Sequence, residues 1–189
     1  ALPEGSSLIA NGTFEDDPPG SVPAGYGTWQ AEGGTGAFGV DDTTGYRSRR
    51  SLRLSGAANA CYQYTIDVKP GETYGAESLC RQRGKGSPAM AIYWKDAEHQ
   101  WNWPAGITRV SYRPYDGEWR QAVARVQVPP TGVAQLTVLL AVEGQASEAD
   151  TVWFDNLRLV NTTPAAAAAA PRREMTTHFV PRLDPTSLQ

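Results

Sequence analysis

The sequence predicts an all-β domain in which two antiparallel sheets pack face to face. Three observations support this prediction. Short apolar and β-branched segments alternate with turns rich in Gly, Pro, Asn and Asp. The 189 residues include 19 glycines and 14 prolines, which suits a chain with many turns. Before residue 160, no segment keeps the i, i+3, i+4 apolar spacing of an amphipathic helix.

The predicted strands are all short, and turn residues punctuate the gaps between them. One such gap, residues 16–20, reads Asp-Asp-Pro-Pro-Gly. In chain order the predicted strands are Ser7–Ala10, Gly27–Glu32, Gly36–Asp41, Ser51–Ser55, Cys61–Val68, Thr73–Arg83, Ala89–Asp96, Glu118–Val128, Ala134–Glu143 and Thr151–Val160.

The segment Lys69–Glu72 predicts a tight turn between two of these strands. Its Pro-Gly pair suits the two corners of a type II turn, because the second corner needs a positive φ. If the flanking strands form a hairpin, Cys61 and Cys80 lie close together in one sheet. Two states are then open for this pair: a disulfide, which would suit an exported protein, or two small buried thiols.

The last predicted strand, Thr151–Val160, carries an acid into an apolar face. Regular alternation places on one face Trp153, Asp155, Leu157 and Leu159. A buried carboxylate is costly unless it is protonated, paired or bound to a metal. If the first and last strands pair, Asp155 and Glu15 can share a calcium ion, which prefers oxygen ligands. The alternative is a bulge at Asp155-Asn156 that turns the acid to solvent.

Bulk composition excludes some classes of partner. The net charge of −3 and the isoelectric point of about 5.4 give no bulk attraction to nucleic acid or to an anionic membrane. No apolar run approaches the roughly 20 residues of a membrane helix. The chain begins at Ala1 without a basic and apolar leader, as a mature or a trimmed N-terminus would. We expect a monomer that binds neither nucleic acid nor a membrane.

The composition changes abruptly after Val160. Residues 161–189 include six consecutive alanines between prolines, too few for an independent helix in water. We therefore predict a β-sandwich domain over residues 1–160 and a Pro/Ala-rich linker or tail over residues 161–189. A linker implies a neighbour, so this domain is expected to be attached to a larger protein.

Five short motifs occur in the order seen in certain carbohydrate-binding modules. They are Asn11–Glu15, Gly45–Leu54, Val68–Tyr74, Trp119 with Val128-Pro129, and Trp153–Leu157. Over residues 8–160 the chain resembles modules of families four, nine and twenty-two, which share a galactose-binding-like jelly-roll sandwich. The resemblance implies a secreted, non-catalytic module that binds a polysaccharide or oligosaccharide. It also implies a covalently attached catalytic domain, such as a glycoside hydrolase.

The same resemblance implies a structural calcium that ties the first loop to the last strand. Carried over by position, its ligands are the side chains of Glu15 and Asp155 and the carbonyls of Thr13 and Arg49. Typical relatives have two acids where this chain has Asp155-Asn156, so only the first is available here.

A sugar site needs aromatic faces that the core does not use. Trp101 and Trp103 lie in a loop with no obvious strand partner, and Tyr112 and Tyr115 follow in the next part of that loop. These four residues predict a loop-built aromatic platform. The alternative is that one tryptophan covers the end of the sandwich as a hydrophobic lid.

The other tryptophans lie within strand patterns. We assign Trp29, Trp119 and Trp153 to packing, because they also match core positions of the family. Trp94 shares the parity of its apolar neighbours and is expected in the core, which leaves Tyr93 facing the other way.

Two charged residues are the predicted polar contacts to the sugar. Arg81 faces away from the inward set of its strand. Glu143 falls near the position at which relatives of family twenty-two hydrogen-bond their sugar. The commoner role for either is a solvated charge on an outer face. The matching aromatic two positions earlier in that family is Ala141 here, so the site is not a faithful copy.

The sequence shows no catalytic constellation. His99 and His178 are the only histidines, and no nucleophile–histidine pair, metal-ligand spacing or phosphate-cradling glycine loop occurs. The predicted function is therefore a non-catalytic carbohydrate-binding module that holds an attached enzyme near its polysaccharide. The alternatives are a structural or docking β-sandwich without a sugar site and, third, a small lyase or hydrolase.

Overall fold

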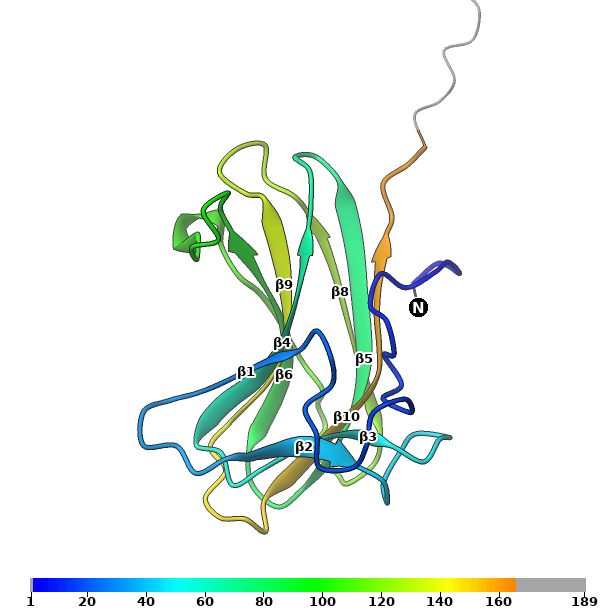
Figure 1. Cartoon of the computed structure of the whole chain (residues 1–189), viewed down its shortest axis with the longest axis vertical. Coiled ribbons are helices and arrows are strands. Elements are labelled where there is room, and N and C mark those ends of the chain that lie inside the picture. The colour runs from blue at the N-terminus through cyan, green and yellow to red at the C-terminus, as the bar shows by residue number, and fades with distance from the viewer. Residues whose placement is uncertain (1, 166–189) are drawn as a thin grey trace, which may run out of the picture.

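The computed structural model describes residues 2–165, which form a jelly-roll β-sandwich of two antiparallel sheets (Figure 1). Sheet A contains, in spatial order, β1 (Gly27–Gln30), β4 (Asn59–Asp67), β9 (Gln135–Glu143), β6 (Ser87–Lys95) and β7 (Thr108–Ser111). Sheet B contains β2 (Ala37–Asp41), β3 (Ser51–Ser55), β10 (Thr151–Asn161), β5 (Thr73–Arg83) and β8 (Arg120–Gln127). The predicted all-β sandwich is confirmed.

Every predicted strand after the first is present. Ser7–Ala10 is not a strand, although Leu8 N–H donates to the carbonyl of Leu159 at 2.7 Å and so runs beside β10. Figure 1 shows this N-terminal segment, in dark blue, beside β10. The short strand β7 and the 3₁₀ turn η1 (Trp103–Ala105) were not predicted, because each is too short to show a periodic pattern.

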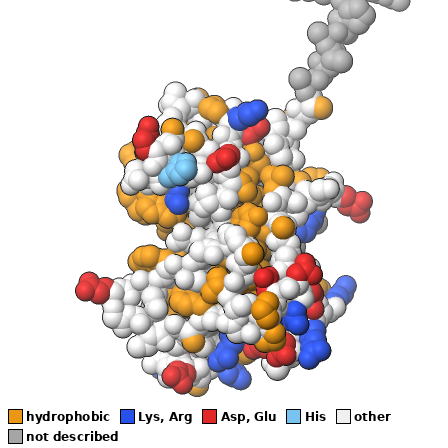
Figure 2. Space-filling model, in the orientation of Figure 1, with side chains coloured by type: hydrophobic (Ala, Val, Ile, Leu, Met, Phe, Trp, Pro, Cys, Tyr) orange, Lys and Arg blue, Asp and Glu red, His pale blue; other side chains and the backbone are white. Residues whose placement is uncertain are grey.

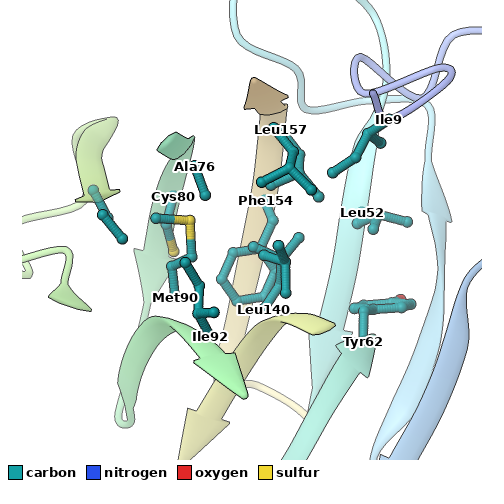
Figure 3. Close-up of a cluster of buried hydrophobic side chains, with 14 of the residues drawn as sticks. Ile9, Leu52, Tyr62, Ala76, Cys80, Met90, Ile92, Leu140, Phe154 and Leu157 are labelled. Carbon is teal, nitrogen blue, oxygen red and sulfur yellow. The ribbon is translucent and has the colours of Figure 1, made fainter. Parts of the chain in front are cut away.

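The core lies between the two sheets, where alternate side chains of both meet. Figure 3 shows part of it, with aliphatic, aromatic and sulfur side chains interdigitating. Trp94 is 5% exposed and belongs to this core, as its parity predicts. Both inner faces are thus apolar, and burial of this kind stabilises the sandwich at about 25 cal/mol per Å².

The strands on either side of Lys69–Glu72 do not form a hairpin. Gly71 has the positive φ of the predicted turn, 81°, but the turn carries the chain from sheet A to sheet B. Cys61 pairs with Ala141 in sheet A, and Cys80 lies in sheet B with its side chain in the core. Both are buried free thiols, so the disulfide is excluded. A type II turn fixes only local direction and does not determine which sheet the next strand joins.

A bulge interrupts β10, and regular alternation along the whole strand was wrong. The register against β5 shifts between Asp155 and Arg158, and Asn156 has a φ of 49°. Phe154 and Leu157 therefore both face the core. The bulge turns Asp155 to the outer face, but the acid is 0% exposed, because neighbouring loops cover it. The bulge named as the alternative is therefore present, but it does not expose the acid to solvent.

Charged side chains are unevenly distributed over the surface. In the view of Figure 2, acidic and basic side chains gather at the lower right, while apolar side chains occupy much of the middle. No helix among the described residues is long and apolar enough to cross a membrane. The last strand ends at Asn161, and the predicted linker lies outside the described residues from position 166 onward.

Candidate functional site

The outer face of sheet A carries a depression of about 280 Å³ with an apolar floor. The floor belongs to a small buried cluster separate from the main core, made by Cys61, Ala91, Leu139 and Ala141, of which all but Ala91 line the depression. These side chains face outward because their strand neighbours, such as Leu140, face inward. Since three of the four are small, the floor lies close to the backbone. We call this depression the groove.

Aromatic side chains stand on both sides of the groove. Trp29 projects from the edge strand β1 on one side and is 49% exposed. On the other side, Trp101 and Trp103 come from the connection between β6 and β7. Their rings stack with centroids 5.9 Å apart and planes at 29°, and Tyr93 on β6 meets both edge-on at 5.8 and 5.7 Å. Contacts of this kind hold rings in fixed orientations.

Local bonds hold the tryptophan loop in place. Trp101 forms an isolated bridge with Lys95, whose ammonium lies 4.4 Å from the Trp101 ring centroid. Asn102 accepts a hydrogen bond from Ala105 N–H through Oδ1 and donates one from Nδ2 to the carbonyl of Gly132, at 2.6 Å. The side chain of Asn102 therefore caps η1 and ties the loop to the β8–β9 connection.

Polar groups complete the lining of the groove. Arg109 on β7 and Glu143 at the end of β9 form an ion pair of 3.5 Å, and their side chains are 39% and 53% exposed. Asn59 and Gln63 on β4 add amide donors and acceptors. Exposed ion pairs contribute little to stability, so this pair is free to exchange its partners for a ligand.

The structure gathers only part of the predicted sugar-binding set. Trp101, Trp103 and Glu143 all line the groove. Trp103 is 57% exposed, so it is not a lid over the core.

Three members of the set lie elsewhere. Tyr112 is 1% exposed and hydrogen-bonded to Ser78, so its predicted contact with a sugar is wrong. Tyr115 packs against the main core and does not line the groove. Arg81 lies on the outer face of sheet B, on the other side of the sandwich.

Of the three tryptophans assigned to packing, Trp29 is exposed and Trp153 is buried. Trp29 is not a core residue: it pairs with Cys61 at the sheet edge, and both face the groove. Trp153 is buried but on the outer face of sheet B, between Arg53 and Arg81 of the adjacent strands. Trp119 is half-buried and meets Tyr46 edge-on. Tyr62 faces the core and pairs with Thr28, so the next residue, Trp29, faces outward. This orientation could be predicted only if the pairing of β1 with β4 were known.

The two predicted calcium-binding acids lie close together, Asp155 on β10 and Glu15 in the N-terminal segment. Asp155 accepts hydrogen bonds from Tyr46 N–H at 2.7 Å, from Ser48 Oγ at 3.2 Å and from Asn156 N–H at 2.7 Å. Burial raises the pKa of Asp155 to about 6, and the charge of Glu15 adds to this rise. Glu15 itself accepts a hydrogen bond from Arg50 N–H at 2.6 Å.

This arrangement fits a hard cation. Within residues 2–165, neither Glu15 nor Asp155 has a basic side chain within 4 Å of its carboxylate. The guanidinium of Arg50 instead donates to the backbone carbonyls of Glu15 and Asp17. No cluster of three or more His, Cys, Asp or Glu occurs in the same range, so a cation here would also need carbonyl oxygens. Calcium accepts such oxygen ligands.

Residues 6–150 match the family described as "Carbohydrate binding domain", which covers families 4 and 9. This chain belongs to that family. Among curated protein sequences, none matches the chain. The family gives the class of ligand, and the groove described above brings aromatic rings and polar groups together on this member.

Solved structures share the fold at low sequence identity. The xylan-binding domain of family 22 from Paenibacillus barcinonensis is 12% identical, with a TM-score of 0.55, and the match covers 75% of this chain and 88% of that one. A Stig cyclase from Fischerella sp. TAU is 15% identical, with a TM-score of 0.61, and the match covers 84% and 98%. The fold therefore supports both binding modules and enzymes.

A larger protein also contains this fold. The enzymatically active domain of tailspike protein 4 of bacteriophage CBA120 is 17% identical, with a TM-score of 0.59 over 82% of this chain. The present chain spans about a fifth of that structure, 21%.

Proposed function

We propose that this domain binds a polysaccharide chain in the groove on sheet A and catalyses no reaction. The observation that supports the proposal most directly is the pair of aromatic sides across an apolar floor, with Trp29 opposite Trp101 and Trp103. The C–H faces of pyranose rings stack on such flat aromatic surfaces. Two opposed sides can hold a sugar chain from both faces at once.

Hydrogen-bonding groups would then fix the orientation of the sugar. Glu143 and Arg109 line the groove as an ion pair, and Gln63 lines it from β4. Sugar hydroxyls both donate and accept, so a carboxylate, a guanidinium and an amide can each be satisfied by one ligand. Specificity among neutral polysaccharides should depend on these groups more than on the rings.

Affinity electrophoresis in gels that contain soluble polysaccharides tests the proposal. The double variant Trp101→Ala/Trp103→Ala should lose retention, while its melting temperature stays close to that of the wild type, because Trp103 is mostly exposed. Ile107→Ala is the matched control, since Ile107 is 51% exposed and does not line the groove. Full retention by the double variant would exclude the groove, and no retention of the wild type on any polymer would favour a structural or docking role.

The proposal includes one calcium ion bound by Glu15, Asp155 and the carbonyls of Thr13 and Arg49. Its support is a fully buried carboxylate, Asp155, beside a second acid and without a basic partner among the described residues. The ion would neutralise both charges and join the N-terminal loop to β10. Chelation should then lower the melting temperature.

Attachment to a catalytic domain and export from the cell complete the proposal. The strand β10 ends at Asn161, and a Pro- and Ala-rich sequence follows. Cell-wall polysaccharides lie outside the cell, and a tethered module raises the local concentration of the attached enzyme at its polymer. Activity on insoluble and on soluble substrate, compared with and without this module, tests the tethering.

A further inference from the structure

The outer face of sheet B carries a second depression, of about 470 Å³, on the opposite side of the sandwich from the groove. Three exposed arginines line it: Arg53 on β3 and Arg81 and Arg83 on β5. Trp153 on β10 lies between them, paired with Arg53 on one side and with Arg81 on the other. Cross-strand partners project to the same face, so these side chains form one row.

Within residues 2–165, no carboxylate forms an ion pair with the arginines of this row, although Arg53 and Asp41 attract each other at longer range. Arg81 Nε donates to the carbonyl of Gly117 at 2.7 Å, Arg53 donates to Ser55 Oγ at 3.4 Å, and the Arg83 guanidinium lies 5.4 Å from the Trp153 ring centroid. None of the three is within 4 Å of a carboxylate in residues 2–165. By contrast, Arg49, Arg109, Arg120 and Arg158 each form an ion pair with a carboxylate.

One acid, Asp41, lies among the residues that line the depression, and its oxygens are already used. Oδ2 accepts from Trp153 Nε1 at 3.0 Å, and Oδ1 accepts from Thr43 N–H and Oγ1 at 2.7 and 2.6 Å. Three guanidinium groups therefore outnumber one carboxylate, in a chain whose net charge is −3. The positive charge is a property of this depression and not of the whole protein.

We propose that this face is a second ligand site, which binds the carboxylate of a hexuronate unit in an acidic polysaccharide. Guanidinium groups hold carboxylates through paired N–H donors in a fixed fork. Thr43 and Thr44 also line the depression and offer hydroxyl groups to the sugar ring. The carbohydrate-binding family of the chain narrows the anion to one that a sugar carries.

Recognition at this site differs physically from recognition in the groove. Trp153 is 7% exposed and covered by Arg83, so no open ring is available for stacking. Charge-assisted hydrogen bonds would supply the affinity, and salt screens them. The site does not depend on the groove, because the two lie on different sheets.

Isothermal titration with trigalacturonate, in buffer without free calcium, tests the proposal. Binding should weaken severalfold between about 50 and about 300 mM salt. The fully methyl-esterified trimer, which keeps the sugar rings and loses the charge, should bind at least about tenfold more weakly.

Variants then locate the site. Arg53→Gln/Arg81→Gln should weaken binding at least about tenfold. Lys69→Gln/Arg113→Gln removes the same charge from positions outside this face and should keep most of the affinity. Arg53→Lys/Arg81→Lys keeps the charge without the fork and should fall between these two variants. Trp101→Ala/Trp103→Ala should bind the acidic trimer as the wild type does.

Several outcomes would overturn this second site. They are equal binding of the ester, equal losses in the Gln variants of both pairs, loss of trimer binding in the groove variant alone, and no binding by the wild type at about 1 mM trimer. A failure of the groove proposal would appear separately, as unchanged retention of the groove variant on neutral polymers.

Discussion

The two outer faces of the sandwich differ far more than the two inner ones. Both inner faces are apolar and meet in one core. The outer face of sheet A has a floor of small apolar side chains with tryptophans on either side, whereas that of sheet B has a row of arginines around a covered tryptophan. The fold therefore leaves the choice of ligand to the outward residues of each strand.

The largest effect on stability should come from an alanine substitution at an inward position of β9, compared with the same substitution at the neighbouring outward position. Leu140 faces the core at 1% exposure, and its neighbour Leu139 faces the groove floor at 7%. Leu140→Ala should cost about 3–5 kcal/mol of unfolding free energy, because it leaves a cavity between the sheets.

Leu139→Ala should cost about 1–2 kcal/mol, since the space it leaves opens to solvent. Urea denaturation of both variants measures the difference. Equal losses would show that the groove floor is as tightly enclosed as the core.

The outer face of sheet B should also couple stability to pH through Asp155. Its pKa is raised by burial to about 6 in the folded state, so without metal its contribution to stability is fully present below pH 4 and is lost as pH rises through 6. The loss amounts to about 3 kcal/mol at most.

Bound calcium reverses this trend, because it favours the ionised acid. Calcium should therefore raise the melting temperature at pH 7 and have little effect at pH 4. Melting curves with calcium and with chelator at both pH values decide the matter, and Asp155→Asn should abolish the calcium response. A response to calcium that is equal at both pH values would contradict this account.

Filling the groove floor should weaken binding of the neutral polymer without affecting binding of the acidic trimer. Ala141→Trp places a large ring where Ala141 and Cys61 now leave the floor low. Retention on neutral polysaccharide should fall about a hundredfold, with trigalacturonate binding unchanged. Titrations with both ligands on the same preparation provide the measurement, and parallel losses of both would show that the sites are not independent.

The smallest effect should come from the single ring on the far side of the groove. Trp29→Ala removes one stacking surface and leaves the Trp101–Trp103 pair intact. Affinity for the neutral polymer should fall about tenfold, with no change in melting temperature. A marked drop in melting temperature would return Trp29 to a packing role.

Local pattern predicted which way most side chains point, because alternation is a local property of a strand. Trp94 faces the core as its parity predicts, and Tyr93 faces outward. Trp101 and Trp103 could be predicted as surface residues because they lie outside any strand pattern that would place them in the core. The same reasoning placed Trp29 wrongly, since an edge strand has the alternation of a central one.

Sheet membership could not be predicted, because it depends on contacts between residues far apart in the sequence. The turn at Lys69–Glu72 has the residues of a hairpin turn but connects two sheets, and this separates Cys61 from Cys80. The bulge after Asp155 likewise depends on the loops that cover β10, including Tyr46 and Ser48. No pattern within the strand itself encodes these contacts.

The hydrogen bond from Asn102 to the Gly132 carbonyl has a consequence for how such a module diverges. It makes the pitch of the two stacked indoles depend on a neighbouring connection that contributes no ring. Insertions or exchanges in that connection would tilt the indoles while leaving their identity intact. Related modules with identical tryptophan loops could thus differ in their preference for a flat or a twisted glycan.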